Sequence, residues 1–408
     1  MSLISLGNVD KKILIPIIGG LLSLIYNFFV KLNSEYEILS KNPFILSVYS
    51  AIGMIMSFIP FLILKSQIKK QIKYKENYID SNKLKKTKLF IKYEHYDIYK
   101  VKRWDKYKLI IIATLFDFTD TLLNFIFCYN CIYNLWVFDI LFNSLFSYLI
   151  LKAKLYKHQY ISMIIIIILG CGLNVIEFFK SEGNNTIKPI EIIVKFIDEM
   201  FFCLNTVINK YNMETYFSSP YEICLCEGLI ELVLFIIVLI VFIKIGVTIE
   251  DIKYPDNYKT YINNFNKYDL LIVISAVFIN FIYNISILIT CNYFTPCHVL
   301  IILIISECYY YLKSDDKIIL NILGIIILSL IFFMFLFFIE VLEINSFGIS
   351  LNTKRNISIR ADSDLTLNFT QNDMSLDYEE TEIEEDKNNS LLEITSINSK
   401  DKNKGIAD

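Results

Sequence analysis

Long apolar segments between charged residues recur along the chain and predict membrane-spanning helices. A helix needs about 20 apolar residues to cross a bilayer. Four such segments contain no Asp, Glu, Lys or Arg: residues 13–30, 42–64, 158–176 and 318–339. A longer uncharged stretch, 270–306, exceeds the length of one span. Cys291, Asn292, Thr295 and Pro296 interrupt it, so we predict two helices joined by a tight turn.

Four weaker apolar segments carry internal acidic residues and complete a predicted set of ten helices: residues 109–127, 132–151, 190–209 and 222–243. The expected fold class is therefore an all-α membrane protein of about ten transmembrane helices. Lys11 and Lys12 precede the first apolar segment, and no small-residue cleavage site follows it. We expect a retained signal anchor there rather than a cleaved signal peptide.

The formal net charge of −3 conceals an uneven distribution. Residues 65–108 hold 15 Lys and Arg against 5 Asp and Glu, a net charge of +10. Residues 341–408 hold 7 against 14, a net charge of −7. Without these two segments, about 14% of the remaining side chains are charged, compared with about 25% in a typical globular protein. Such an apolar body disfavours a soluble enzyme, a nucleic-acid binder and a disordered scaffold.

Lys-rich and Arg-rich short loops face the cytosol in most membrane proteins, so we expect both termini there. The predicted parts are a short cytosolic N-terminus (1–11), two five-helix halves (12–178 and 179–345) and a disordered acidic cytosolic tail (346–408). The first half contains the basic cytosolic loop 65–108, which contacts anionic lipid or forms a solvated, partly helical linker. A glycosylation sequon at Asn184 then falls on the luminal side.

Two segments of the chain, 148–170 and 310–324, resemble each other. Each contains Tyr and Lys, then a polar linker, then an Ile-rich run that ends in Leu-Gly, at Gly170 and Gly324. They join predicted spans 4 and 5 and predicted spans 9 and 10. Because five spans separate them, equivalent helices would cross the bilayer in opposite directions. Inverted repeats of this kind are common in secondary transporters.

Polar side chains form stripes on several predicted spans. Asp117, Asp120, Thr121 and Asn124 are spaced i, i+3, i+4 and i+7, which places them on one helix face. A carboxylate in a membrane helix costs about 2.5–3.5 kcal/mol, so such a stripe favours a water-filled cavity or a proton-coupling role. Interhelical hydrogen bonding is the alternative, especially for the Asn residues. The candidate pathway residues are Asp117, Asp120, Asn124, Asp139, Asn143, Asp198, Asn205, Asn280, Asn284 and His298.

Three further ionisable residues leave two interpretations open. Glu227 and Glu231 are spaced i, i+4 and either line the same path or lie near the cytosolic headgroups. His298 and Glu307 lie on opposite faces of one helix, so only one of them can face a cavity. We prefer His298, because a His titrates near neutral pH, although a helix-end hydrogen bond explains it equally well.

Sequence motifs for enzymatic chemistry are missing from the chain. There is no P-loop, no metalloprotease motif, no nucleophile elbow and no dinucleotide-binding fingerprint. Cys128 and Cys131 lack a second pair at zinc spacing, so we expect free apolar cysteines, or a luminal disulfide between these two. We therefore predict no enzyme, no cofactor and no metal. The expected partners are a small-molecule solute, the lipid bilayer, no nucleic acid and, as an open possibility, a second copy of the chain.

The run from Phe116 to Leu173 resembles the drug/metabolite transporter superfamily, and within it the F branch of the solute carrier 35 family, which is related to nucleotide-sugar transporters. The resemblance rests on Phe116-Asp117-Phe118-Thr119, on 133–143 and on Leu169-Gly170, with a second-half counterpart from Thr295-Pro296-Cys297-His298 to Gly324. It covers about residues 12–345. It implies ten spans as two inverted five-helix repeats, with alternating access and a pathway between predicted spans 1, 3, 4, 6, 8 and 9.

The resemblance also has a departure that affects the cargo. F-branch relatives carry an Arg-Gly pair early in span 4, where this chain has Phe142-Asn143. A pathway with several carboxylates and no clear Lys or Arg suggests a neutral or cationic solute, whereas the resemblance implies a nucleotide sugar, and both cargoes stay open. We therefore expect a secondary transporter of a small polar metabolite in an endomembrane, such as the Golgi, endoplasmic reticulum, vacuole or lysosome. The alternatives are a membrane-embedded transferase and an orphan channel or receptor.

Overall fold

Helices account for almost all of the described secondary structure. The computed structural model describes residues 4–6, 13–32, 43–77, 103–127, 135–180, 189–216, 218–245, 248–249, 252–253, 267–312 and 317–344. Apart from Ile344, these residues belong to one structural unit, Ile4–Glu343. The predicted tail 346–408, the sequon at Asn184 and the cysteines 128 and 131 lie outside the described residues.

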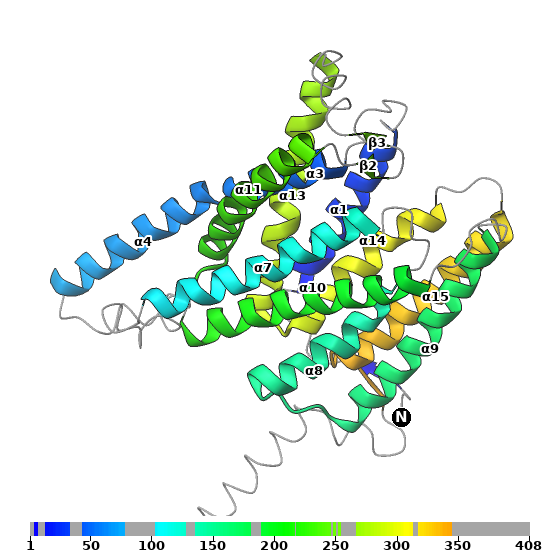
Figure 1. Ribbon diagram of the computed structural model, residues 1–408. Helices are drawn as coiled ribbons and strands as arrows, with labels where there is room; N and C mark the ends of the chain where they lie inside the picture. The colour runs from blue at the N-terminus through cyan, green and yellow to red at the C-terminus, as the bar shows by residue number, and fades with distance from the viewer. Residues whose placement is uncertain are drawn as a thin grey trace, which may run out of the picture. The chain divides into compact units, whose positions relative to one another are not determined.

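The described ranges contain ten helical segments. In this count, two consecutive helices separated by a two-residue turn form one segment, and each of two short 3-10 turns belongs to the helix that follows it. They are α1 (Leu14–Leu32), α3 (Pro43–Ile55) with α4 (Phe58–Asn77), α7 (Arg103–Phe127), η3 (Trp136–Phe138) with α8 (Asp139–Leu151), α9 (Lys157–Lys180), α10 (Pro189–Thr215), α11 (Pro220–Ile245), α13 (Lys267–Tyr293), η4 (Pro296–Val299) with α14 (Leu300–Leu312), and α15 (Ile318–Phe338). Figure 1 shows how they are arranged.

The strands are short and lie before, between and after the helices. Strand β1 (Ile4–Leu6) pairs with β4 (Leu342–Ile344) in a two-stranded sheet. Strand β2 (Thr248–Ile249) pairs antiparallel with β3 (Ile252–Lys253), with Thr248 opposite Lys253. These small sheets do not change the class of the fold, which is helical as the apolar segments predict.

Five helical segments are long and apolar enough to cross a membrane: Ser47–Gln67, Lys157–Lys180, Pro220–Phe242, Val273–Tyr293 and Ile318–Phe338. Three shorter helices, Leu14–Ile25, Trp136–Leu151 and Pro296–Tyr309, are also apolar. Many large apolar side chains on these helices face outward, for example Ile168, Val233 and Ile319. An exposed apolar surface of this extent requires lipid or a partner to cover it. The helices therefore indicate an integral, multi-pass membrane protein.

One boundary differs in detail from the sequence prediction, and one predicted interruption is confirmed. The span predicted at 42–64 is broken at Met56 and Ser57 and then continues as a helix to Asn77. The first part of the basic segment 65–108 is therefore helical rather than loop. The predicted interruption of 270–306 is confirmed, because α13 ends at Tyr293 and η4 begins at Pro296. Proline suits this position since its fixed φ favours the first turn of a helix and it has no N–H to donate.

Helices α7 and α10 are amphipathic, and their polar faces meet. On α7, Ile111, Ile112 and Leu115 are exposed, whereas the stripe that begins at Asp117 faces inward. The two helices run antiparallel, because the ring of Phe116 stacks on that of Phe201 with centroids 5.4 Å apart, and Lys195 reaches Asn124. Their charges explain why neither helix reaches the hydropathy of a long apolar span.

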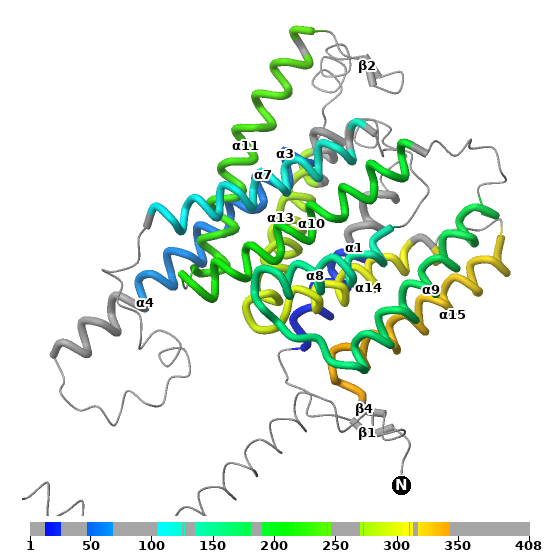
Figure 2. The backbone as a smooth tube through the Cα atoms, turned by 60° about the horizontal axis from the view of Figure 1, so that its bottom comes forward, coloured from blue at the N-terminus to red at the C-terminus, as the bar shows by residue number. Residues whose placement is uncertain are grey.

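Most of the helix contacts join helices from the two halves of the chain. Helix α1 packs on α13 and α14, and α10 packs on α7 and α8. Helix α3 packs on α11 and α13, and α7 also packs on α11. Helix α9 packs on α15, and α14 packs on α15. In Figure 2 the long α9–α15 pair lies at one side of the α8 and α14 helices.

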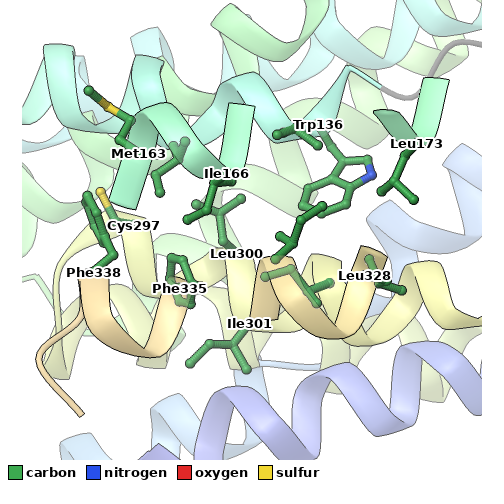
Figure 3. Packing of buried hydrophobic residues seen from close by; sticks show 14 of the residues in the cluster. Trp136, Met163, Ile166, Leu173, Cys297, Leu300, Ile301, Leu328, Phe335 and Phe338 are labelled. Carbon is green, nitrogen blue, oxygen red and sulfur yellow. The ribbon is translucent and has the colours of Figure 1, made fainter. Parts of the chain in front are cut away.

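An apolar core fills the space between α9, α15 and the starts of α8 and α14 (Figure 3). Trp136, Ile166, Leu300, Leu328 and Phe335 are each at most 4% exposed. Lys317, at the start of α15, donates to the carbonyls of Phe179 and Lys180 at the end of α9, at 3.2 and 3.0 Å. Gln159, at the other end of α9, donates to the carbonyl of Phe338 at 3.2 Å. Helices α9 and α15 are therefore antiparallel along their length.

The two glycines of the predicted repeat both allow close helix packing, but they contact opposite ends of the preceding helical segment. A Cβ on Gly170 would collide with the side chain of Val137, just before α8 begins. A Cβ on Gly324 would collide with the ring of Tyr311, in the last turn of α14. The similarity of 148–170 and 310–324 therefore does not extend to the contacts of these glycines.

Candidate functional site

A small polar cavity lies between α3, α7, α10, α11 and α13. Its lining residues are Met54, Asp117, Phe202, Asn205, Thr206, Asn209, Glu227, Asn284, Ile287, Leu288 and Cys291. The space available to water molecules in it is about 30 Å³. Since one water needs about 10–15 Å³ by this measure, the cavity holds about two waters in this conformation. All five helices contribute, so the sequence brings its polar residues together only through the packing of both halves.

Asp117 lies at the meeting point of the carboxyl groups of this cavity. Its side chain faces Glu231 and Asn205. Asn209 donates to Asn205 at 2.7 Å and to Glu227 at 2.7 Å. Glu227 and Glu231 are 3% and 4% exposed, so they lie inside the helix bundle. This burial shows that the pair faces other helices of the protein rather than its outer surface.

A second polar cluster surrounds Lys195 on α10. Its ammonium group contacts Asp198 at 2.6 Å, Glu199 at 3.0 Å and the side-chain oxygen of Asn124 at 3.0 Å. Asp120 faces Asp198 and also interacts with Lys195. Lys195 is therefore a basic residue beside the stripe of α7 that the sequence prediction missed, and it is not among the residues that line the cavity. The spacing of Lys195, Asp198 and Glu199, at i, i+3 and i+4, is the signal that could have found the pair.

Asp139 and Asn143 lie on α8 against α10. Asp139 is fully buried and faces Glu199, and its two carboxyl oxygens have no hydrogen-bond partner among the described residues. Asn143 accepts a hydrogen bond from the hydroxyl of Thr206 at 3.0 Å. This contact joins α8 to the cavity, because Thr206 is one of the cavity residues.

The two asparagines on α13 have different surroundings. Asn284 lines the cavity and donates to the hydroxyl of Ser50 at 3.2 Å, so it joins α13 to α3. Asn280 donates to the carbonyl of Ala276 in its own helix at 2.9 Å. Its Cβ also lies beside Gly53, where a Cβ on the glycine would be only 3.3 Å away. Asn280 therefore lies at a helix contact and is not among the residues that line the cavity.

His298 makes local contacts at the start of its helix. Its Nδ1 is 2.9 Å from the hydroxyl of Thr295, and its ring stacks on Phe294 with centroids 4.8 Å apart. This is the helix-end interaction that the sequence left open, and His298 does not line the cavity. Lys210 lies nearby on α10 and donates to the carbonyl of Asn292 at 3.3 Å.

Ion pairs lie near the start of α7, beyond the lining of the cavity. Lys106 on α7 contacts Glu222 on α11 at 2.5 Å, and both side chains are mostly buried, at 9% and 15% exposed. Asn212 on α10 donates to the carbonyl of Lys106 at 3.3 Å. Lys210 pairs with Glu214 at 3.0 Å. Toward the other end of α7, the Lys195 cluster joins α7 to α10, so the cavity lies between two sets of charged contacts.

Within the part of the chain that the structure describes, no group of three His, Cys, Asp or Glu side chains is arranged to hold a metal ion. No known protein-family model matches the chain, and no curated protein sequence is significantly similar to it. The site must therefore be interpreted from its own chemistry, which combines amide and carboxyl groups inside a set of apolar membrane helices.

Proposed function

We propose that the protein is a secondary transporter that moves a small polar solute across a membrane by alternating access between two inverted five-helix repeats. The observation that carries this proposal is the buried cavity lined by Asp117 and Glu227 at the meeting of helices from both halves. The proposed topology has ten spans and cytosolic termini, in an endomembrane.

The energy of burial supports a functional role for this cavity. A carboxylate in a membrane helix costs about 2.5–3.5 kcal/mol on insertion scales. Helix α7 carries two, Asp117 and Asp120, and α11 adds Glu227 and Glu231 to the same interior. A protein that only needed stable packing would fill these positions with apolar or small residues, as α9 and α15 do. Intramembrane ionisable residues of this kind mark substrate and ion pathways.

The helix contacts support two repeats. If each helix of the first half is exchanged with its counterpart five segments later, the pair α7–α10 becomes α13–α1, and α8–α10 becomes α14–α1. Both of these pairs are in contact. Likewise α7–α11 becomes α13–α3, also a contact. The 3-10 turns η3 and η4 precede the equivalent helices α8 and α14.

The directions of equivalent helices support inversion of the repeats. Helices α9 and α15 are counterparts and run antiparallel, as their end contacts require. Helices α3 and α11 are counterparts as well. Ser57 donates to the carbonyl of Tyr221 near the start of α11, whereas Ala51 clusters with Phe235 further along it. These two helices are therefore also antiparallel. Inverted repeats of this kind surround midplane substrate sites in secondary transporters.

The small volume of the cavity is consistent with an occluded state. Room for about two waters is too little for a metabolite, so one set of helices must move to admit it. The ion pair Lys106–Glu222 and the cluster of Lys195 lie beyond the two ends of the cavity and are the contacts that we expect to open in turn.

Uptake into proteoliposomes tests the proposal. The purified full-length chain is reconstituted, and uptake is measured over a panel of sugars, nucleotide sugars, amino acids and amines, with and without a pH gradient. We expect saturable uptake of one class and none in protein-free liposomes. If the reconstituted protein is folded and monodisperse but takes up no solute of the panel, the proposed function is wrong.

A further inference from the structure

We propose that the cavity binds the ammonium group of an organic cation between Asp117 and Glu227, in exchange for a proton. This inference rests on the proposed transport function and specifies its substrate class. It follows from the charges and the hydrogen bonds of the cavity, which both require a ligand that carries positive charge and donates N–H groups.

The cavity contains carboxyl groups and no basic side chain. Two carboxyl groups, Asp117 and Glu227, line it, and Glu231 faces Asp117. No Lys, Arg or His is among the lining residues. The lysines around the cavity already have carboxylate partners: Lys195 pairs with Asp198 and Glu199, Lys210 with Glu214, and Lys106 with Glu222. A buried carboxyl group without a basic partner attracts a cation or keeps a proton.

The hydrogen bonds of the cavity lack donors. Asn209 uses its amide nitrogen on two acceptors, Asn205 and Glu227, which fixes the orientation of the amide. Its oxygen then has no partner among the described residues, and Asn209 is only 1% exposed. This unpartnered atom accepts hydrogen bonds, so the missing ligand is a donor. An ammonium group supplies up to three N–H donors.

A proton takes the place of the cation when the site is empty. Two carboxylates only accept hydrogen bonds, so Asp117 and Glu231 can share their contact only with a proton between them. The other titratable groups that act on Asp117 are Asp120 on its own helix, Glu227 and Cys224 on α11, and Tyr283 on α13. None of these is a base that could neutralise it. When an ammonium group binds, its N–H groups replace the shared O–H, and the proton leaves to water.

The size of the cavity agrees with a charged head group of this kind. An ammonium nitrogen with its hydrogens occupies about the space of one water, and the cavity holds about two. The apolar lining residues Ile287, Leu288 and Met54 offer a surface for the methylene groups next to the nitrogen. The remainder of a larger cation would enter only as the helices separate.

Three four-carbon probes that differ only in their end groups test the substrate class: putrescine, 1,4-butanediol and succinate. Binding of labelled putrescine to the full-length protein in nanodiscs is measured directly, with the diol and the dicarboxylate as competitors, and uptake of each is measured in proteoliposomes. We expect saturable binding of putrescine alone. Its apparent affinity should rise with pH, by up to about tenfold per pH unit, because one proton competes with one cation.

Two isosteric variants test the location of the site. Asp117→Asn and Glu227→Gln should each weaken putrescine binding about tenfold or more, since each removes one charged hydrogen-bond acceptor. Asp117→Asn should also remove the pH dependence. Asp105→Asn is the matched control, because it makes the same substitution on α7 at a residue that is 40% exposed and lies outside the cavity. It should bind like the wild type.

The outcomes separate this inference from the proposed function. Saturable transport of the diol, succinate or another uncharged or anionic solute, without putrescine binding, would overturn the cation site and leave the transporter standing. Putrescine binding that Asp117→Asn and Glu227→Gln both leave unchanged would also overturn it. If one variant does not fold, the other variant and the pH dependence of the wild type decide the question.

Discussion

Two long helix pairs of this protein, α7–α10 and α9–α15, solve the problem of packing in a membrane in opposite ways. The α9–α15 pair joins an apolar core of residues such as Ile166, Leu328 and Ile331, with its polar contacts near the helix ends. The α7–α10 pair buries the Lys195 cluster and the carboxyl group of Asp117. Both pairs are antiparallel and extensive, so packing alone does not require the acids.

The difference shows where the protein accepts an energetic penalty. Apolar side chains give a membrane helix its stability without any desolvation cost, and α9–α15 follows that rule. The acids of α7 and α10 are tolerated only because neighbouring polar groups from α8 and α11 surround them. A region that keeps such groups at a cost of stability is the region in which we expect function. The predictions below test whether the two pairs really respond differently.

The largest effect is expected when Lys195 loses its charge. Lys195→Met leaves Asp198 and Glu199 buried without their partner, which should destabilise the fold by about 3–5 kcal/mol. Lys108→Met is the control, since Lys108 is 53% exposed and lies 4.0 Å from its partner Asp105. It should change the stability by less than about 1 kcal/mol. Thermal unfolding in nanodiscs measures both. Equal losses of stability in the two variants would show that the buried ion pairs of Lys195 stabilise the fold no more than an exposed ion pair does.

An intermediate loss of stability is expected when a methyl group is added at Gly228, and none when it is added at Gly172. A Cβ at Gly228 on α11 would lie 2.7 Å from the Cβ of Met54 and 2.8 Å from the carbonyl of Ala51. Because the backbone of α3 cannot move aside cheaply, Gly228→Ala should destabilise the protein by about 1–3 kcal/mol.

The matched substitution lies on α9. At Gly172 the nearest atom to a new Cβ would be Ile327 Cδ1 at 3.7 Å, an ordinary contact. Gly172→Ala should therefore be neutral, or stabilise by up to about 1 kcal/mol through its helix propensity. Chemical or thermal unfolding of the two variants side by side checks the pair, and a loss of stability at Gly172 larger than at Gly228 would contradict the packing described for α9 and α15.

The smallest effect on stability has the opposite sign. Asp139 is fully buried, and its carboxyl oxygens have no hydrogen-bond partner among the residues described. Asp139→Asn replaces a buried carboxyl group that has no hydrogen-bond partner by an uncharged amide, and should raise the stability by about 1 kcal/mol. The same variant should lower solute uptake, as expected for a group retained for function. A variant that melts earlier and transports normally would mean that Asp139 has only a structural role.

Much of the helical plan could be predicted from the sequence, because lipid demands long apolar runs and those runs are visible without a structure. The turn after Tyr293 was readable from Pro296, since proline cannot continue a helix with a full set of hydrogen bonds. The helical spacing of the polar residues predicted the stripe on α7, and Asp117 does line the cavity. These features depend only on local sequence.

What could not be predicted depends on contacts between distant segments. Glu227 is four residues from Glu231, but only the packing of α11 on α7 shows that both are interior. The role of Asn280 at Gly53 and the local partner of His298 depend likewise on neighbours far away in the sequence or on side-chain rotamers. Gly170 and Gly324 resemble each other in sequence, yet they fit against opposite ends of the helices before them.

One measurement tests the central claim that α7, α10, α11 and α13 enclose a polar path in a membrane protein. The wild-type protein in proteoliposomes is treated with a small hydrophilic, membrane-impermeant thiol reagent, and mass spectrometry quantifies the modification of each cysteine. Cys291 is 0% exposed and lines the cavity, whereas Cys171 is exposed on the outer surface of α9. We predict that Cys291 is modified, because the cavity opens to water during transport, and that lipid protects Cys171. Rapid modification of Cys171 with full protection of Cys291 would contradict the account.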